Sequence, residues 1–261
     1  MAARSMLGEG WSPVTTTRFR QIFELVSAGE ADIGVVPLEN ALAGSVHENY
    51  DLLAEFELSI VAEHYCPVQL HLMSGGSAVS EVRQVVSHPK ALEQCSNFLE
   101  SRPGLEQVNF SDTAGAALHV KESEIPGLAA IASEEAASAY GLTIIARSIQ
   151  NHAVNSTRFV AVSRGPAPAP DVCSKCSLLL TLPHVPGSLA RLLSAIAASG
   201  GDVTKIESRP ILGKPFEYRF YLDVKPQDAG DGAIRRAVQA AQGVSVSCRV
   251  LGAYTAAASA F

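Results

Sequence analysis

The sequence predicts an α/β protein built from two domains. Three observations indicate this: helical and extended patterns alternate up to about residue 163, a proline-rich segment follows, and the rest reads in the order β-α-β-β-α-β. The 261 residues are 47% hydrophobic and 18% charged, a composition that excludes a disordered or collagen-like chain. At roughly 150 residues per domain, this length corresponds to one large domain or two modest ones.

The first domain opens with a helix and a strand. Phe19, Phe23 and Val26 recur at helical spacing, Gly29 provides the helix end, and an apolar strand is expected at residues 33–37. This order, helix then strand, is the start of a layered α/β pattern.

The same pattern continues along the domain. A half-buried strand is expected at residues 68–72, and a strand at residues 84–87 leads into a helix opened by Pro89. Asp112 and Ser133 stand where N-caps belong, before two alanine-rich helices. The alternation favours a mostly parallel sheet, and sites in such sheets lie at the carboxyl ends of the strands.

Residues 164–172 form the expected linker between residues 1–163 and residues 173–261. Pro166, Pro168 and Pro170 alternate there, and each removes a backbone donor and favours an extended chain. Cys173 and Cys176 follow directly in a C-x-x-C pattern. Without a second ligand pair, they are interpreted as the edge of the linker and not as a zinc or redox site.

In the second domain, the hydrophobic pattern changes between the two-residue period of a strand and the 3.6-residue period of a helix. Leu178, Leu180 and Leu182 alternate as in a strand, and a helix follows until Gly200-Gly201. Further strands are expected at residues 203–208, 216–224 and 244–250, with a helix at 234–241. This order resembles a ferredoxin-like unit of about 80 residues. Both helices would cover one face of its sheet, so the other face needs a partner, and we expect a homodimer or homotetramer.

Charge, hydropathy and cysteine content narrow the function classes. The chain has 20 Lys and Arg against 26 Asp and Glu and no dense basic run, which disfavours a nucleic-acid partner. No apolar stretch approaches the ~18 residues that cross a bilayer, so no membrane association is expected. Five scattered cysteines, an odd number, indicate a reducing compartment. The common nucleotide, protease and metal motifs are absent from the sequence, and we assign no metal and no cofactor.

Three loops concentrate polar residues where strands meet helices: residues 37–45, 87–90 and 155–159. Backbone N–H groups at such junctions attract anions, Arg158 offers two parallel donors to a carboxylate, and Thr157 and Ser45 offer hydroxyls. The loops therefore suggest a small carboxylate ligand. The alternative is that Ser45 and Ser87 only cap helices and that Arg158 lies on a surface strand.

A resemblance becomes specific at these residues. The segments Gly34-Val-Val-Pro-Leu-Glu-Asn40, Ser87-His-Pro with Gln94-Cys95, Asp112-Thr-Ala-Gly-Ala116 and Thr157-Arg-Phe159 resemble the prephenate/arogenate dehydratase family. Lys205-Ile-Glu-Ser-Arg-Pro210 resembles the phenylalanine-binding motif of that family's C-terminal ACT domain. The resemblance extends from about Pro13 to Tyr254.

The resemblance implies a fold, an activity and a set of site residues. The fold is a two-subdomain catalytic domain similar to type II periplasmic binding proteins, followed by an ACT domain of the ferredoxin-like type. The activity is conversion of prephenate or arogenate to phenylpyruvate or phenylalanine, with phenylalanine as effector. The implied catalytic residues are Asn40, Ser87, Gln94, Thr157, Arg158 and Phe159, the substrate-binding residues are Glu39, Ser45 and Arg158, and the effector-binding residues are Gly187, Ser188, Leu189, Glu207, Ser208, Arg209 and Pro210.

One departure from the family pattern concerns the start of the chain. Family members begin with a strand, a glycine-rich loop and a helix, whereas residues 1–10 here lead almost directly to the next family element. Since that loop resembles a wall of the substrate site, an alternative function is a catalytically inactive phenylalanine-binding regulatory protein. The motifs fit both bacterial cytoplasm and the plastid stroma of a plant or alga, and the preference between prephenate and arogenate stays open.

Overall fold

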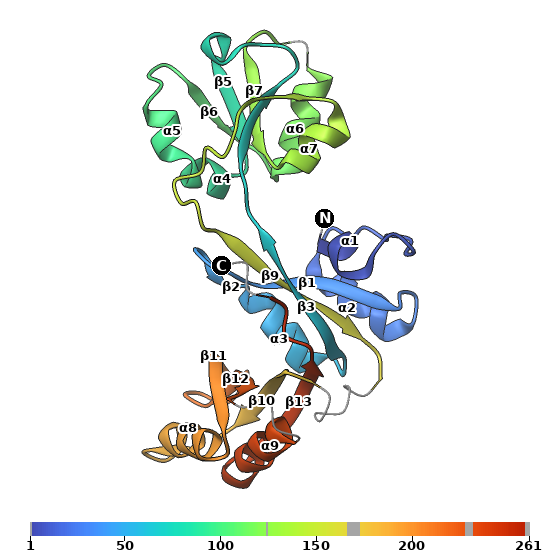
Figure 1. The fold of residues 1–261 in the computed structure, drawn as a ribbon, viewed down its shortest axis with the longest axis vertical. Coiled ribbons are helices and arrows are strands. Elements are labelled where there is room, and N and C mark those ends of the chain that lie inside the picture. Colours follow the sequence, from blue (N-terminus) through green and yellow to red (C-terminus); the bar gives the residue numbers. More distant parts are fainter. Residues whose placement is uncertain (1, 124, 166–172, 228–231, 259–261) are drawn as a thin grey trace. The chain divides into compact units, whose positions relative to one another are not determined.

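The computed structural model describes residues 2–123, 125–165, 173–227 and 232–258 (Figure 1). The chain divides into two compact units, one made of Met1–Cys66 with Thr157–Ala260 and the other of Pro67–Ser156. The second unit is thus an insertion into the first. Most of the expected linker, residues 166–172, lies outside the described residues.

One sheet of the first unit has the strand order β2-β1-β9-β3. β1 pairs antiparallel with both β2 and β9. The elements of this part are α1 (Ala2–Leu7), α2 (Phe19–Ala28), β1 (Ile33–Asn40), β2 (Gly44–Ser45), α3 (His47–Glu55), β3 (Ser59–Pro67) and β9 (Ser156–Ser163).

The helix predicted around Phe19 is confirmed as α2. Phe23 and Val26 are its buried residues, and Gly29, at φ 82°, is its left-handed C-cap. Helix α1 has no counterpart among the sequence predictions. The strand expected at residues 33–37 is confirmed and extends to Asn40, which brings the polar pair Glu39-Asn40 onto the sheet.

The C-terminal part of the first unit has the predicted order β-α-β-β-α-β. Its four strands pair antiparallel in the order β11-β12-β10-β13. Leu178, Leu180 and Leu222 pack on Leu192 and Ile196 of the first helix to form its core. The elements are β10 (Lys175–Thr181), α8 (Ser188–Ala198), β11 (Gly201–Pro210), β12 (Tyr218–Pro226), α9 (Ala233–Val244) and β13 (Ser247–Tyr254).

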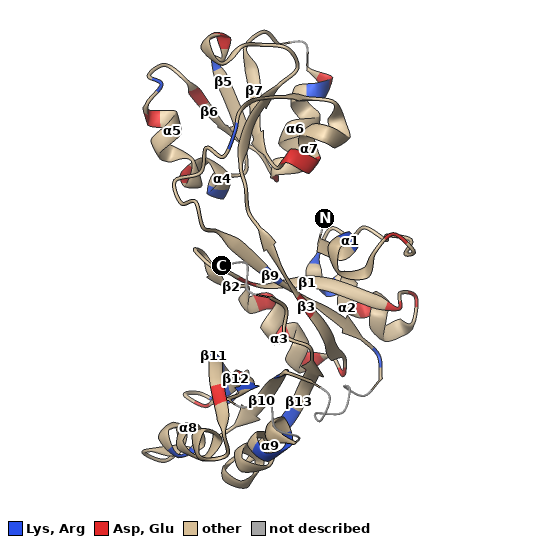
Figure 2. Cartoon of the chain, in the orientation of Figure 1, with Lys and Arg blue, Asp and Glu red and all other residues tan. Residues whose placement is uncertain are grey.

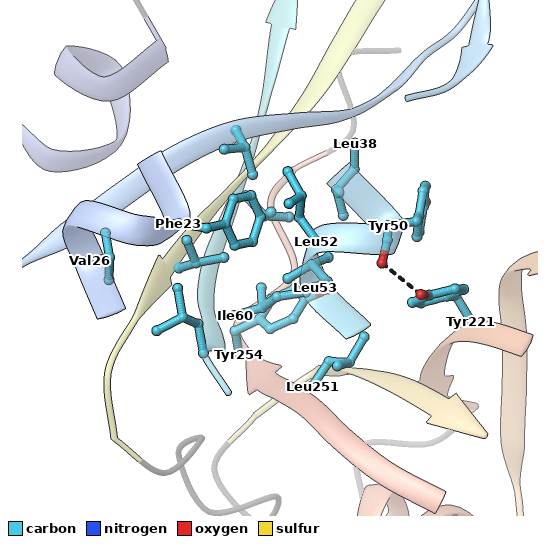
Figure 3. Close-up of a cluster of buried hydrophobic side chains, with 14 residues drawn as sticks. Phe23, Val26, Leu38, Tyr50, Leu52, Leu53, Ile60, Tyr221, Leu251 and Tyr254 are labelled. Atoms are coloured by element: carbon cyan, nitrogen blue, oxygen red, sulfur yellow. Dashed lines mark hydrogen bonds between the residues drawn. The ribbon is translucent and has the colours of Figure 1, made fainter. Parts of the chain in front are cut away.

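The other face of this C-terminal sheet packs on the N-terminal part of the same unit (Figure 3). Tyr221, Leu251 and Tyr254 belong to one buried cluster with Leu53 and Ile60. The Tyr221 hydroxyl donates to the backbone oxygen of Tyr50 at 2.6 Å, and the two rings meet edge to face. The expectation that this face needs a partner chain was therefore wrong, because residues of the same chain cover it.

One hydrogen bond from a charged side chain crosses the same contact. Acidic residues lie along α3, and a basic residue lies on β13 (Figure 2). Arg249 of β13 donates to the backbone oxygen of Leu53 in the last turn of α3. A cation at a helix C-terminus is stabilised by the helix dipole.

The second unit has one sheet in the order β6-β5-β7-β4-β8. β5 is parallel to β6 and β7, but β4 is antiparallel to β7 and β8. The elements are β4 (His71–Ser74), η1 (Val79–Glu81), β5 (Gln84–Ser87), α4 (Pro89–Gln94), α5 (Ser96–Glu100), β6 (Glu106–Asn109), α6 (Thr113–Glu122), β7 (Leu128–Ala132), α7 (Glu134–Tyr140) and β8 (Thr143–Ala146).

The predicted caps are confirmed, and two strand predictions are corrected. Asp112 accepts from the Gly115 N–H at 2.7 Å, and Ser133 accepts from Ala136. The strand expected at residues 68–72 begins only at His71. It is buried on both faces, because Leu72 packs in one core cluster and Met73 packs in another. The mostly parallel sheet is also wrong, since β1 pairs antiparallel with β2 and β9, and β4 pairs antiparallel with β7 and β8.

Within the described ranges, the structure has no helix with the length and apolar character needed to cross a bilayer.

Candidate functional site

The site starts from a pair of polar side chains on adjacent strands. Asn40 is the last residue of β1, and its register partner on β9 is Thr157. The Asn40 Nδ2 donates to the Thr157 Oγ1 at 3.0 Å. Since the threonine oxygen accepts this bond, its own proton remains available to donate to another acceptor.

The orientation of the Asn40 amide is fixed by the turn that follows it. Its Oδ1 accepts from the backbone N–H groups of Leu42 at 3.0 Å and Ala43 at 2.9 Å. Only an oxygen can accept these two bonds, so the NH₂ group must face Thr157. The turn between β1 and β2, residues 40–44, therefore determines how the Thr157 hydroxyl is held.

Neighbouring residues of β9 point to opposite faces of the sheet, as in any strand. Asn40 shares a face with Thr157, and Glu39, the register partner of Arg158, shares the opposite face with that arginine. Phe159 lies on the Thr157 side and has Pro37 as its partner. The sheet thus separates the predicted site residues into two groups.

Arg158 lies in a buried ionic cluster with side chains of four other strands. Its Nε donates to Glu63 at 2.8 Å, one terminal nitrogen donates to Asp223 at 2.5 Å, and the other donates to the Tyr254 hydroxyl at 2.9 Å. Lys175 donates to the same Glu63 at 2.7 Å. Arg158 is only 3% exposed, and the two cations balance the two carboxylates.

The charged side chains in this cluster shift one another's pKa values. Burial alone raises the pKa of Asp223, but Arg158 and Lys175 outweigh that effect and hold the pKa below its ordinary value. Burial alone lowers the pKa of Arg158, and the carboxylates, Asp223 foremost, raise it well above the usual value. Burial raises the pKa of Tyr254 as well. Asp223 and Arg158 are therefore both charged at neutral pH, whereas the Tyr254 hydroxyl keeps its proton.

The guanidinium of Arg158 is enclosed on the face of the sheet opposite Thr157. Each of its three nitrogens donates to a side chain of the protein, and the residue is buried. The physical reason is the strand period: a residue next to Thr157 on β9 must point away from the face that Thr157 occupies.

The side chains of Glu39 and Ser45 contact strand β11. Lys205 donates to the Glu39 Oε1 at 2.6 Å and to the Ser45 Oγ at 3.0 Å. The Ser45 hydroxyl donates in turn to Glu207 at 2.5 Å, and Arg209 forms an ion pair with Asp51 of α3 at 2.6 Å. Residues predicted to bind substrate and residues predicted to bind the effector therefore meet in one polar network.

Ser87 and Gln94 lie in the second unit, at the two ends of a short segment. Ser87 ends β5, is fully buried, and donates through its hydroxyl to the Ile131 backbone oxygen of β7 at 2.6 Å. Gln94 ends α4, and its backbone oxygen accepts from the Asn151 N–H at 2.7 Å.

The predicted effector residues fall into two places. Gly187, Ser188 and Leu189 line a pocket of about 440 Å³ between the β10–α8 loop and the β11–β12 hairpin, with Tyr218 and Phe220 on the hairpin side. Glu207 and Arg209 are not among its lining residues, since their side chains contact Ser45 and Asp51. Of the effector motif, the structure brings none of residues 207–210 into this pocket.

Sequence reasoning assigned no site role to Glu63, Lys175, Asp223 and Tyr254, and it quoted Lys205 only as the first residue of the effector motif. A signal was present for Asp223, a charged residue that stands between Leu222 and Val224 in a strand. A charged residue in such a strand needs an oppositely charged partner when it is buried. Among the residues that the structure describes, no group of three or more His, Cys, Asp or Glu is arranged to hold a metal ion.

Fold and site together define an α/β protein that carries an amide-held hydroxyl on an antiparallel sheet and ends in a βαββαβ part. A model of the prephenate dehydratase family matches residues 1–167, which include Asn40 and Thr157. The chain belongs to the prephenate dehydratase family.

Individual relatives agree with this assignment. Arogenate dehydratase/prephenate dehydratase 2, chloroplastic, of Arabidopsis thaliana is 38% identical over 252 residues, which are 92% of this chain and 66% of that protein. Proteins with such names are lyases. The chain spans about two thirds of the length of the curated relatives that it matches.

Two solved structures are similar over nearly the whole chain. One is prephenate dehydratase from Arthrobacter aurescens in complex with L-Phe, with a TM-score of 0.81 and 31% identity over 93% of this chain and 81% of that one. The other is GqqA, described as a novel type of quorum quenching acylase, with a TM-score of 0.86 and 32% identity over 98% of this chain and 93% of that one.

Proposed function

We propose that this protein is a dehydratase that converts prephenate or arogenate to phenylpyruvate or phenylalanine and responds to phenylalanine. Family membership supports the reaction class, and the hydrogen bond from Asn40 to Thr157 is the single observation that carries the mechanism. The domain division follows the sequence: a catalytic domain of two subdomains over residues 1–163, a linker, and an ACT domain over residues 173–261.

The reaction removes two groups from one ring. The bond from the ring to its carboxylate breaks, CO₂ leaves, and the electron pair enters the ring. The 4-hydroxyl leaves with its own bonding pair, takes up one proton and becomes water. Because the product is aromatic, the catalyst has to orient the substrate and protonate the leaving oxygen.

Thr157 is the proposed donor to that oxygen. The bond from Asn40 occupies one lone pair of the hydroxyl and directs its proton away from Asn40. A threonine hydroxyl is a weak acid, so its contribution depends on position and not on its pKa. Phe159, on the same face, is proposed to contact the ring. Ser87 and Gln94 are carried over as further catalytic residues on their family motifs alone.

Arg158 is proposed as a positioning residue. Its cluster with Glu63 and Asp223 fixes β9 from the face opposite Thr157. Glu39 and Ser45 are proposed as substrate-binding residues on their family motifs alone. Their side chains lie on the face opposite Thr157 and bond to β11, which links the loop to the C-terminal part.

Phenylalanine is the proposed effector, and the pocket around Gly187, Ser188 and Leu189 is the proposed place for its side chain. The pocket has the size of a small-molecule site and is lined mainly by apolar groups such as Leu182 and Phe220. The complex of the Arthrobacter relative with L-Phe supports this choice of ligand. A homodimer or homotetramer is proposed as the assembly, on the family resemblance.

A second candidate is acyl hydrolysis, supported by the likeness to the acylase over 98% of this chain. Such chemistry needs a nucleophile activated by a base. Thr157 is bonded to an amide, which is no base, and the hydroxyl of Ser87 donates to a backbone oxygen. The described geometry therefore favours the dehydratase.

The test is direct. The purified chain is incubated with prephenate, with arogenate and with an N-acyl amide, and phenylpyruvate, phenylalanine and free acid are measured. Formation of phenylpyruvate or phenylalanine supports the proposal and reports the substrate preference. Phenylalanine binding by calorimetry without turnover of either dehydratase substrate would establish the inactive regulatory protein instead.

A further inference from the structure

Lys205 of β11 is tied to both sides of the turn that carries Asn40. Its ammonium donates to Glu39, the residue before Asn40, and to Ser45, the cross-strand partner of Glu39. The Lys205 side chain is 18% exposed. One cation from the C-terminal part thus joins the end of β1 to β2.

Glu207 completes this arrangement from the same strand. The Ser45 hydroxyl accepts from Lys205 and donates to Glu207 at 2.5 Å, so both the position of its oxygen and the direction of its proton are determined. Bonds that involve an ionised group are about twice as strong as neutral ones, and these are partly shielded from water.

Inside the turn, the backbone holds the reacting pair. Asn40 keeps its orientation because two N–H groups of the turn, those of Leu42 and Ala43, bond to its Oδ1. A change in the shape of the turn would move these N–H groups and with them the amide that bonds Thr157. The path from Lys205 to the Thr157 hydroxyl is therefore short and consists of named hydrogen bonds.

We propose that Lys205 is a positioning residue of the dehydratase site: it closes the β1–β2 turn so that the Asn40 amide meets the Thr157 hydroxyl. The proposal rests on the proposed function. In this proposal the C-terminal part also contributes to the reaction, because Lys205 lies outside residues 1–167, the part that matches the family model.

The first experiment compares Lys205→Met with Lys205→Arg and with a matched control, Lys214→Met. Lys214 carries the same charge in the same part of the chain, and its ion pair is with Glu217 on the β11–β12 hairpin. We expect Lys205→Met, which removes the hydrogen bonds to Glu39 and Ser45, to lower kcat about tenfold. Lys205→Arg keeps the charge and should stay within about threefold of the wild type, and Lys214→Met should not change kcat.

The second experiment separates positioning from a general loss of structure. Lys205→Met is repeated in an Asn40→Ala background, as a double-mutant cycle. If Lys205 acts through Asn40, its removal should change kcat less than about twofold there. An equal loss of kcat in both backgrounds would overturn the proposal.

A third measurement does not depend on turnover. Hydrogen exchange is followed for the Leu42 and Ala43 amides and for the Val46 amide, which donates to the Leu38 backbone oxygen at 2.8 Å. The wild type, Lys205→Met and Lys214→Met are compared. Faster exchange in Lys205→Met alone supports the proposal, and unchanged exchange refutes it. If the wild type converts neither substrate, the proposed function fails, while the exchange data still decide whether Lys205 holds the turn.

Discussion

Thr157 and Arg158 are neighbours on β9, yet they serve opposite faces of one sheet. The hydroxyl of Thr157 accepts from Asn40 on one face, and the guanidinium of Arg158 is enclosed by Glu63, Asp223 and Tyr254 on the other. A chemical role and a structural role thus fall on adjacent residues of the chain. The two roles lead to different expected effects of mutation.

Replacement of Thr157 by Val should lower kcat by about 10²- to 10⁴-fold with little change in KM, because the contact to the leaving oxygen forms mainly in the transition state. Valine keeps the shape of the side chain, so the melting temperature should stay close to that of the wild type. Steady-state kinetics with prephenate and arogenate measure the effect. Unaltered kcat would remove Thr157 from the mechanism.

Replacement of Arg158 by Met should act mainly on stability. It leaves two buried carboxylates with Lys175 as their remaining cation, and breaking a buried ion pair costs about 3–5 kcal/mol. The free energy of unfolding from urea titration measures this. Arg20→Met is the matched control, since the Arg20–Glu55 pair is solvent-exposed and should contribute little. Equal stability of the two variants would contradict the buried cluster.

The same cluster predicts a pH dependence. The pKa of Asp223 is lowered in the folded state, so its contribution to stability is complete above its unfolded pKa, about 3.9, and is lost as the pH falls through the folded value. Asp223→Asn should be less stable than the wild type at pH 7, and the difference should shrink below about pH 4. Urea titrations between pH 7 and pH 3 test this, and a difference that is constant with pH would contradict it.

Tyr221→Phe should lower the free energy of unfolding by about 1 kcal/mol, because the bond to the Tyr50 backbone oxygen is lost in a buried place. Tyr218→Phe is the control on the same strand, since Tyr218 is 45% exposed. Thermal melting of both variants compares them. A smaller effect at Tyr221 than at Tyr218 would count against the contact between the C-terminal sheet and α3.

Gly252→Ala should be strongly destabilising. The new methyl group would overlap the backbone oxygen and carbon of Ile60, and backbone atoms cannot move aside cheaply. Gly243→Ala in α9 is the opposite case, because its methyl group meets open space and alanine favours a helix by about 1 kcal/mol. The melting temperatures should therefore change in opposite directions.

Most of the local structure could be predicted from the sequence. The helix end at Gly29, the caps at Asp112 and Ser133, and the βαββαβ order follow from spacing and backbone chemistry, and the structure confirms them. These features depend on residues close together in the chain, and that is why pattern reasoning finds them.

Pairings between distant residues were harder to predict. The antiparallel contact of β1 with β9 joins Asn40 to Thr157 across the whole second unit, and no local pattern encodes its direction. The partners of Arg158 lie on strands of two sheets, so its enclosure could not be derived from the Thr157-Arg-Phe159 motif. The alternation of the strand, however, already implied that Thr157 and Arg158 cannot face one ligand together.

The inserted second unit also constrains how the chain is made. β1 lies between β2 and β9 in its sheet, and β9 begins only after Pro67–Ser156 has been synthesised. During synthesis, residues 1–66 therefore emerge before β9, and the edge of β1 that pairs with β9 stays unpaired until residues 67–156 have been made. The hydrogen bond between Asn40 and Thr157 can therefore form only after β9 has been synthesised and has paired with β1.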